Sequence, residues 1–449
     1  MLNIPSKLAA REEPVQVGVI GSGLFGTNLI DQIEPVTGLE TAVVADIDTD
    51  KAVRTLRETG VPSDEITVAE SATEAEAVRA EGGRAVVEAG MDLIETGVDV
   101  VVEATGIPNI GAKYAYEAIT EKKHVVMVNV EADTVVGPIL SSYADQNDVT
   151  YTMAYGDQPA CIVELCDWAR TVGMEIVAVG KGNPYRDEYR FGTPDDVFDR
   201  IGFEDEFVEG HNLNPRMFNS FFDGTKVSVE MCAVANAVGL EPDVPGMHIP
   251  TAEIPEIPEK LRPEAEGGLL QNTGVVDTIS TVYEDGSTVE QDISAGVFAV
   301  TSTPTERVQE YLAQYSGAGW HTASDGKYQV FYRPHHLPGL ETGVSVANAA
   351  LNNEPTGATR SQHTEVVGVT KQALSSGTEL DGGGGYTVYG RIETAERAEA
   401  NGHVPFELLD GAVVETSLDR NQVVTYDDVS LEEDTFIYNL RQLQDETGL

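Results

Sequence analysis

A glycine-rich loop near the N-terminus carries the clearest chemical signal in this sequence. Gly21, Gly23 and Gly26 are spaced as GxGxxG, directly after the apolar run Val15–Ile20 and before a helical pattern. In that context the first glycine permits a tight turn, the second lets the backbone approach a pyrophosphate, and the third allows close helix–strand packing. The helix N-terminus offers free N–H groups and a positive dipole end to the phosphates. The pattern predicts a dinucleotide-binding Rossmann unit.

An acidic residue, Asp46, ends the second predicted strand, about 20 residues beyond the glycine loop. A carboxylate at this place can accept hydrogen bonds from both ribose hydroxyls, which favours NAD over NADP. Asp48 and Asp50 follow at once, so a solvated turn is the alternative interpretation.

Further candidates follow the third and fourth predicted strands, because ligands of such sheets bind beyond the carboxyl ends of the strands. Asn129 and Glu131 are expected near the nicotinamide, although either could instead be a structural turn residue. The predicted cofactor-binding set is Gly21, Gly23, Leu24, Phe25, Gly26, Asp46, Ala104, Thr105, Gly106, Asn129 and Glu131.

Lysines are scarce, with ten in 449 residues, so their positions are informative. Lys181 lies between two glycines at the end of an apolar strand, and Lys226 lies between Asp223 and Glu230 at the start of a helix. Hydride transfer to a ketone leaves an alkoxide, which a lysine can protonate and stabilise. The pattern on the helix predicts a proton relay; the alternative is an N-cap with an i,i+4 ion pair.

Other polar residues complete the list of candidates. Asp157 and Gln158 precede Pro159 at a predicted helix start and are expected to face the cleft or to cap the helix. Arg333, His335 and His336 could hold a phosphate or carboxylate, or be structural. The predicted catalytic residues are Lys181, Asp223, Lys226, Glu230 and Asp157. For a divalent cation, the candidate ligands are Glu131, Asp157 and Glu230, although no spacing demands a metal.

Short apolar runs that alternate with helical patterns must position these residues. Strands are expected at Val15–Ile20, Glu40–Ala45, Asp99–Ala104, His124–Val130 and Val149–Ala154. Such β-branched runs separated by helices predict a doubly wound parallel sheet. The segment 71–97 is expected to be helical. Beyond it we expect a strand at Glu175–Val179, a helix at Lys226–Val238, strands within Gly274–Thr301, a helix at Ser345–Leu351, and a β-rich tail.

The amino-acid composition limits the classes of molecule that the protein could bind. Asp and Glu number 75 against 28 Lys and Arg, giving a formal charge of −47, which disfavours nucleic acid and anionic membranes. The acids are spread along the chain, as in proteins adapted to molar salt, where the screening length falls to ~3 Å at 1 M. An acidic face for a basic partner is the alternative. Isolated cysteines, no long apolar run and a polar N-terminus predict a cytoplasmic protein.

The sequence also resembles a known family. The motifs that carry the resemblance are VVEATG (101–106), VVMVNVEAD (125–133), YGDQPA (155–160), VGKG (179–182), FFDGTK (221–226), YRPHHLPGLET (332–342) and GGGYTVYGRIE (383–393). Together they resemble the homoserine-dehydrogenase-like oxidoreductases with a C-terminal SAF domain, a group that includes deoxyxylulose-phosphate-reductoisomerase-like enzymes and resembles the apionate oxidoisomerases. Homoserine dehydrogenases have an Asn-Lys pair after the fourth strand. Here Val130 and Glu131 follow Asn129, which argues against homoserine as substrate.

The resemblance implies an α/β fold with three domains. We expect a flexible arm over 1–14, an NAD(P)-binding Rossmann domain over 15–173, a central α+β catalytic domain over 174–355, and a β-rich SAF-like (β-clip) domain over 360–449. The helix around 345–351 is expected to return to the Rossmann domain. The resemblance also implies a homodimer or homotetramer.

The leading functional hypothesis is an NAD(P)-dependent oxidoreductase acting on a small polyhydroxylated carbonyl compound, sugar acid or sugar phosphate. Named members of the group it resembles couple the hydride step to an isomerisation, and reductoisomerases of sugar phosphates generally use a divalent cation. The alternatives are a homoserine-dehydrogenase-type enzyme of an amino-acid pathway and a non-catalytic protein that binds cofactor or carbohydrate.

Overall fold

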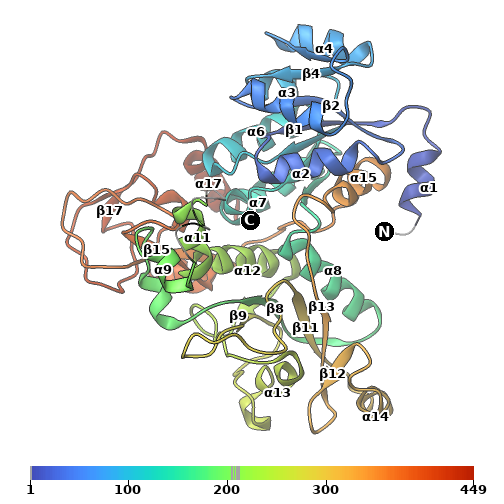
Figure 1. Ribbon diagram of the computed structural model, residues 1–449. Helices are drawn as coiled ribbons and strands as arrows, with labels where there is room; N and C mark the ends of the chain where they lie inside the picture. The colour runs from blue at the N-terminus through green and yellow to red at the C-terminus, as the bar shows by residue number, and fades with distance from the viewer. Residues whose placement is uncertain (1–2, 204–205, 207, 209–212) are drawn as a thin grey trace. The chain divides into compact units, whose positions relative to one another are not determined.

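The computed structural model describes residues 3–203, 206, 208 and 213–449 (Figure 1). The chain divides into two compact units, each drawn from separate parts of the sequence. The first unit comprises Met1–Cys161, Leu337–Arg360 and Thr435–Leu449, and the second comprises Ile162–His336 and Ser361–Asp434.

The first unit is built on a seven-stranded sheet in which every neighbouring pair of strands is parallel, in the order β3-β4-β2-β1-β5-β6-β7. This confirms the doubly wound parallel sheet predicted from the sequence. The strands are β1 Val15–Ile20, β2 Leu39–Ala45, β3 Ile66–Val68, β4 Arg84–Val87, β5 Val100–Glu103, β6 His124–Met127 and β7 Tyr151–Met153.

Helices alternate with these strands: α2 Leu24–Ile33, α3 Thr49–Glu58, α4 Ala72–Ala80, α5 Gly90–Ile94, α6 Pro108–Thr120 and α7 Val130–Gln146. Helices α2 and α3 share one apolar core with the sheet. Apart from the edge strand β3, the strands are mostly buried, because both faces of a parallel sheet are covered. The expectation of helix throughout 71–97 was wrong, because the short run β4 lies fully buried in the sheet between α4 and α5.

Both ends of the chain pack on this first unit. The expected flexible arm contains helix α1 (Ile4–Ala9), whose Ile4 and Leu8 lie on one face and are buried in the core. The helix α15 (Gly343–Asn352) packs against β5, β6 and β7, and the C-terminal helix α17 (Phe436–Thr447) packs against α6 and α7. The last segment therefore groups with the sheet rather than with the β-rich tail that precedes it.

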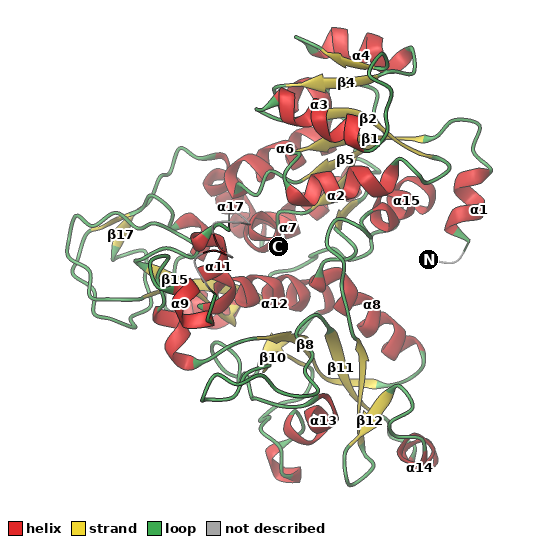
Figure 2. Cartoon of the chain, viewed as in Figure 1, coloured by secondary structure: helices red, strands yellow, loops and turns green. Residues whose placement is uncertain are grey.

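The second unit contains a six-stranded mixed sheet in the order β12-β13-β11-β8-β10-β9. The central strand β8 runs parallel to β10 and antiparallel to β11. The strands are β8 Glu175–Asn183, β9 Glu241–Pro242, β10 Val275–Ser280, β11 Val297–Ser302, β12 Trp320–Thr322 and β13 Tyr328–Arg333. The described helices of this unit are α9 Val197–Ile201, α11 Pro215–Phe222, α12 Thr225–Val238, α13 Ile257–Lys260, α14 Glu306–Gln314 and α16 Ala395–Ala400 (Figure 2). Helix α8 (Gln158–Thr171) begins in the first unit and ends in the second.

The tail of the second unit is β-rich, as expected. Its longest pairing is the antiparallel β14 (Thr364–Thr370) with β15 (Val388–Thr394), and a shorter pair joins β16 (Val413–Val414) to β17 (Val429–Ser430). The helix α12 packs on both β14 and β15. Its Asn236 accepts the backbone N–H groups of His363 and Thr364 at 2.8 Å, which fixes the start of the tail on the helix. The assignment of the tail as a SAF domain stays a prediction.

Within the described residues, no helix combines the length and the apolar character that crossing a bilayer would require. The three cysteines, Cys161, Cys166 and Cys232, form no disulfide with one another, and all are buried.

Candidate active site

The glycine loop has the geometry that a dinucleotide phosphate requires. Gly21 has a φ of 98°, and a Cβ there would lie 2.6 Å from the carbonyl oxygen of Ala104. A Cβ on Gly26 would lie 2.0 Å from the carbonyl oxygen of Gly21, so helix α2 could not approach β1 with a larger residue. Gly23 is the N-cap of α2, and a Cβ there would meet no described atom within 4 Å. The loop is therefore tight where it packs and open where a phosphate would approach.

Asp46 follows β2 and is held against the glycine loop. Its Oδ2 accepts hydrogen bonds from the backbone N–H and the hydroxyl of Ser22, at 2.7 and 2.6 Å, and its Oδ1 accepts the N–H of Asp48 at 2.9 Å. Burial opposes the charged form, but these hydrogen bonds outweigh it and lower the pKa of Asp46. The carboxylate is thus a fixed negative charge beside the loop.

Apolar side chains flank this polar edge. Leu24, directly after Gly23, is 82% exposed, and Ile47, directly after Asp46, is 90% exposed. Phe25 turns the other way and packs against the core. Exposed aliphatic groups beside fixed polar groups are typical of cofactor sites, which are mostly apolar with a few oriented polar contacts.

The end of β5 holds a residue that the sequence analysis missed. Glu103 is fully buried, and its Oε1 accepts the backbone N–H of Thr105 at 2.9 Å and the hydroxyl of the same residue. Burial raises the pKa of Glu103 to about 7, although hydrogen bonds from Thr105 and Asn129 partly offset this. The signal was a charged residue inside the apolar run that ends in Ala104-Thr105-Gly106.

Asn129 and Glu131 follow β6, as predicted. The Oδ1 of Asn129 accepts the N–H of Ala132 at 3.2 Å, so this residue is the N-cap of α7. A Cβ on Gly111 would lie 2.7 Å both from Nδ2 of Asn129 and from Oε2 of Glu103, so these two side chains are held close together beneath α6. Glu131 is half-buried in the first turn of α7, and its charge raises the pKa of Glu103 further.

Asp157 caps the start of α8. Its Oδ1 accepts the N–H of Gln158 at 3.0 Å, and its carbonyl oxygen accepts the N–H of Cys161. The structure thus supports the capping interpretation, while a catalytic role for Asp157 stays a prediction.

In the second unit, Lys181 and Glu230 come together from β8 and α12. The Nζ of Lys181 lies 2.6 Å from Oε2 of Glu230, and the two residues are only 7% and 2% exposed. They are 49 residues apart in sequence. A buried ion pair is costly to break, because removing one partner leaves an uncompensated charge, at about 3–5 kcal/mol.

Asp223 pairs with a lysine that the sequence analysis did not select. Its Oδ2 lies 2.8 Å from Nζ of Lys371, which also donates to the carbonyl oxygens of Gly192 and Gly385. Its Oδ1 accepts the N–H of Thr225 at the start of α12. The scarcity of lysine was the signal that could have pointed to Lys371. Lys226 is half-buried in the first turn of α12.

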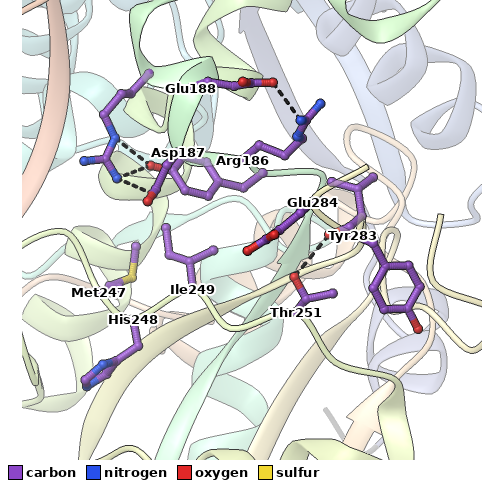
Figure 3. Close-up of a pocket in the computed structure, with 12 residues that line it drawn as sticks. Arg186, Asp187, Glu188, Met247, His248, Ile249, Thr251, Tyr283 and Glu284 are labelled. Atoms are coloured by element: carbon purple, nitrogen blue, oxygen red, sulfur yellow. Dashed lines mark hydrogen bonds and ion pairs between the residues drawn. The ribbon is translucent and has the colours of Figure 1, made fainter. Parts of the chain in front are cut away.

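Two cavities open beside this region of the second unit. The larger, of about 500 Å³, is lined by Tyr185, Arg186, Asp187, Glu188, Arg190, Met247, His248, Ile249, Thr251, Val282, Tyr283 and Glu284 (Figure 3). The smaller, of about 90 Å³, shares four of these residues and adds Asp223, Gly224, Ser228, Pro245, Gly246, Tyr389, Gly390 and Arg391. The tail, helix α12 and the loops that follow β8 and β9 therefore all contribute to the smaller cavity.

A buried carboxyl fixes a loop that lines both cavities through Met247 and Ile249. Asp277 on β10 accepts the backbone N–H groups of His248 and Ile249, at 3.2 and 3.0 Å. Met247 and Ile249 have φ values of 67° and 48°, a strained conformation for these residues. Burial raises the pKa of Asp277 to about 6.

The other predicted polar cluster is more dispersed. Arg333 ends β13, His335 is exposed, and His336 makes a 2.8 Å hydrogen bond with the carbonyl oxygen of Ala295. In the part of the chain that the structure describes, no three His, Cys, Asp or Glu side chains gather in a way that could hold a metal ion. A metal site at Glu131, Asp157 and Glu230 stays a prediction.

Comparison with known proteins identifies the two parts of the chain. Residues 17–153 match the model of the homoserine dehydrogenase NAD-binding domain, and residues 156–342 match that of the catalytic domain of oxidoreductase DRL. The chain thus contains a region similar to a homoserine dehydrogenase NAD-binding domain, followed by a region similar to an oxidoreductase catalytic domain. A sequence search against curated proteins found no significant match.

Solved structures resemble the chain only distantly. Myo-inositol dehydrogenase of Lactobacillus casei, solved with NAD(H) and myo-inositol, is 17% identical over 41% of this chain and 50% of its own, with a TM-score of 0.28. KijD10, a 3-ketoreductase of Actinomadura kijaniata solved with NADP, is 18% identical over 39% and 50%, with a TM-score of 0.27. A "probable dehydrogenase" of Thermotoga maritima is 12% identical over 76% and 90%, with a TM-score of 0.37. The chain thus spans half the length of the first two.

Proposed function

We propose that this protein is an NAD-preferring oxidoreductase that acts on a small polyhydroxylated carbonyl compound, such as a sugar acid or sugar phosphate. The observation that carries the proposal is the buried pair of Lys181 and Glu230 in the domain that matches an oxidoreductase catalytic domain. A charged pair of this kind is expensive to bury, and such groups gather at functional sites.

Lys181 would serve as the proton donor and acceptor. When a ketone is reduced, its oxygen gains negative charge, and an ammonium group beside it both stabilises that charge and supplies the proton. In the reverse direction, the amine would take the proton from the substrate hydroxyl. Glu230 would be a positioning residue, because it holds Nζ of Lys181 at 2.6 Å in one place.

The first unit would hold the nicotinamide cofactor, which supplies or accepts the hydride when bound. Its glycine loop leaves open space at Gly23, and Asp46 presents a fixed carboxylate beside the loop. A carboxylate there would accept hydrogen bonds from the ribose hydroxyls and repel a 2′-phosphate, which supports NAD over NADP. Hydride transfer requires the nicotinamide to reach the substrate held near Lys181.

The coupling of the hydride step to an isomerisation rests only on the family resemblance. A metal would be the usual electrophile for such a step, and the described residues offer no cluster that fits one. In this proposal Lys181 itself carries out the proton transfer.

Fluorescence titration with NADH and NADPH is the first test, in about 2–3 M KCl because the chain is so acidic. We expect tighter binding of NADH. The second test uses mass spectrometry to follow transfer of deuterium from labelled NADH to carbonyl acceptors: keto forms of sugar acids, ketose and aldose phosphates, and the semialdehyde product of homoserine oxidation.

Transfer to the semialdehyde alone would establish the amino-acid pathway alternative. Binding of cofactor by the folded protein with no transfer to any compound would favour the non-catalytic alternative. Transfer that Lys181→Met abolishes without changing cofactor binding would support the proposal. Lys327→Met, which removes an exposed lysine paired with Glu266, is the matched control.

A further inference from the structure

Two arginines face the smaller cavity of the second unit, in a chain with far more acids than bases. Arg190 follows β8 in the sequence, and Arg391 lies on β15 in the β-rich tail. The cavity volume, about 90 Å³, holds several waters and hence a carboxylate or phosphate group. The guanidinium fork matches the geometry of such oxyanions.

Arg190 is oriented but not neutralised by its neighbours. Its Nε and Nη2 donate to the hydroxyl of Tyr185, at 3.0 and 2.6 Å, which fixes the plane of the fork. Its acidic partner, Asp187 at 2.7 Å, has a side chain that is 89% exposed. Water screens an ion pair of this kind, so most of the positive charge stays available to a ligand.

Arg391 also keeps donor capacity. Its stem lies over Gly246, where a Cβ would come within 3.2 Å of its Cγ. Its Nη2 contacts Glu393, but that carboxylate is shared with Arg397 and His403, at 3.6 and 3.1 Å. Its buried Nε has no hydrogen-bond partner among the described residues. Because this Nε has no accessible surface, a ligand in the cavity would be received by the terminal Nη groups of the guanidinium fork.

The remaining polar groups of the wall do not cancel these charges. Tyr389 lies within the electrostatic reach of both arginines, and its hydroxyl donates to Asn421 at 3.0 Å. Asp223 would repel an anion, but Lys371 lies 2.8 Å from its carboxylate and compensates for it.

We propose that Arg190 and Arg391 form an anion-binding subsite that receives the carboxylate or phosphate group of the substrate. This inference rests on the proposed function for its substrate, but the site itself can be tested without turnover. It also gives the tail a role in substrate selection, because β15 supplies Arg391. The sequence pattern had pointed instead to an anion site at Arg333, His335 and His336.

Isothermal titration calorimetry of the full chain with inorganic phosphate and with malonate tests the subsite directly. We expect Arg391→Met and Arg190→Met each to weaken binding by about tenfold to a hundredfold, the cost of losing a hydrogen bond to a charged group. Arg391→Lys should recover part of the affinity. Arg186→Met is the matched control, because Arg186 lines only the larger cavity. None of these variants changes the glycine loop, so any phosphate that binds there contributes equally to every titration.

The outcomes separate the subsite from the proposed function. If folded Arg391→Met and Arg190→Met bind both anions like the wild type, the subsite is wrong whatever the enzyme does. If they lose the anions but the wild type transfers no hydride, the proposed function fails and the anion site stands.

The two anions also distinguish the substrate classes. A loss of phosphate binding alone indicates sugar phosphates, and a loss of malonate binding alone indicates sugar acids. With an active substrate, Arg391→Met should raise KM and leave kcat nearly unchanged. Circular dichroism checks folding, and Arg391→Lys carries the test if Arg391→Met unfolds.

Discussion

The glycine-loop region of the first unit and the paired-charge region of the second are assembled differently. The first is made of backbone. Gly21, Gly23 and Gly26 lie close together in the sequence, and their lack of a Cβ allows the close packing and leaves the open space of the loop. The second is made of side chains from distant segments: Lys181 meets Glu230, and Asp223 meets Lys371. A local backbone site tolerates change around it but not within it, whereas a paired site fails when either partner is lost.

The two regions also treat buried acids differently. Glu103, at the end of β5, has no cation paired to it among the described residues, and burial raises its pKa to about 7. Glu230 is as deeply buried but lies 2.6 Å from an ammonium group. The same residue type is thus held as a hydrogen-bonded carboxyl in one unit and as half of an ion pair in the other.

We expect the largest effect when the pair of Lys181 and Glu230 is broken. Lys181→Met should lower kcat by about 10²–10⁴-fold, because the general acid is lost, and leave NADH binding unchanged. It should also destabilise the fold by about 3–5 kcal/mol, because Glu230 is left buried and unpaired. The double variant Lys181→Met/Glu230→Gln should recover stability in urea unfolding but not activity. Recovery of both would show that the pair is structural only.

The unpaired acid should appear in the pH dependence of stability. The folded-state pKa of Glu103, about 7, lies above the ordinary value of 4.5, so the unfolded chain releases this proton first as the pH rises. Its contribution to stability is therefore full below about pH 4.5 and is lost between about pH 4.5 and 7, amounting to about 3 kcal/mol. Glu103→Gln should remove this part of the slope in urea unfolding, and the exposed Glu121→Gln should not. An unchanged slope in Glu103→Gln would contradict the assignment.

The backbone site can be divided into its packing and its binding parts. Gly26→Ala should destabilise the first unit by about 1–3 kcal/mol and abolish cofactor binding, because its Cβ would meet the carbonyl of Gly21 at 2.0 Å. Gly23→Ala should weaken NADH binding but keep the stability, since that Cβ would meet no described atom within 4 Å. Thermal unfolding and NADH fluorescence measure the two effects. Equal melting temperatures for both variants would show that the loop is not close-packed.

The smallest expected effect concerns cofactor choice. Asp46→Asn keeps the size and shape of the side chain that contacts Ser22, but removes its negative charge beside the glycine loop. The preference for NADH over NADPH should fall by about tenfold, which corresponds to ~1.4 kcal/mol. The ratio of the two dissociation constants from fluorescence titration measures it. Asp50→Asn, a little further along the chain, is the control, and a ratio that shifts equally there would point to a general charge effect.

The sequence predicted the sheet of the first unit well, because continuous β-branched runs and glycine punctuation are local signals. It predicted β1 with the bounds that the structure shows, and the helix that became α15. It missed β4, a run of only four residues, because so short an apolar stretch has no periodicity to separate it from helix. It also took residues 1–14 for an arm, since two apolar residues in α1 gave too little pattern.

What the sequence determined by itself was the class of chemistry: three glycines after a buried strand, with an acid at the end of the next, fix a dinucleotide loop through local sterics alone. What only the tertiary structure decided was which side chains meet. Lys181 and Glu230 were both candidates from the sequence, but their pairing depends on the packing of α12 against the sheet of the second unit. The convergence of Arg190 and Arg391 on one cavity likewise depends on where β15 lies. Spacing along a chain says nothing about such distances, because the free energy that brings these groups together comes from burial of the surrounding apolar surface.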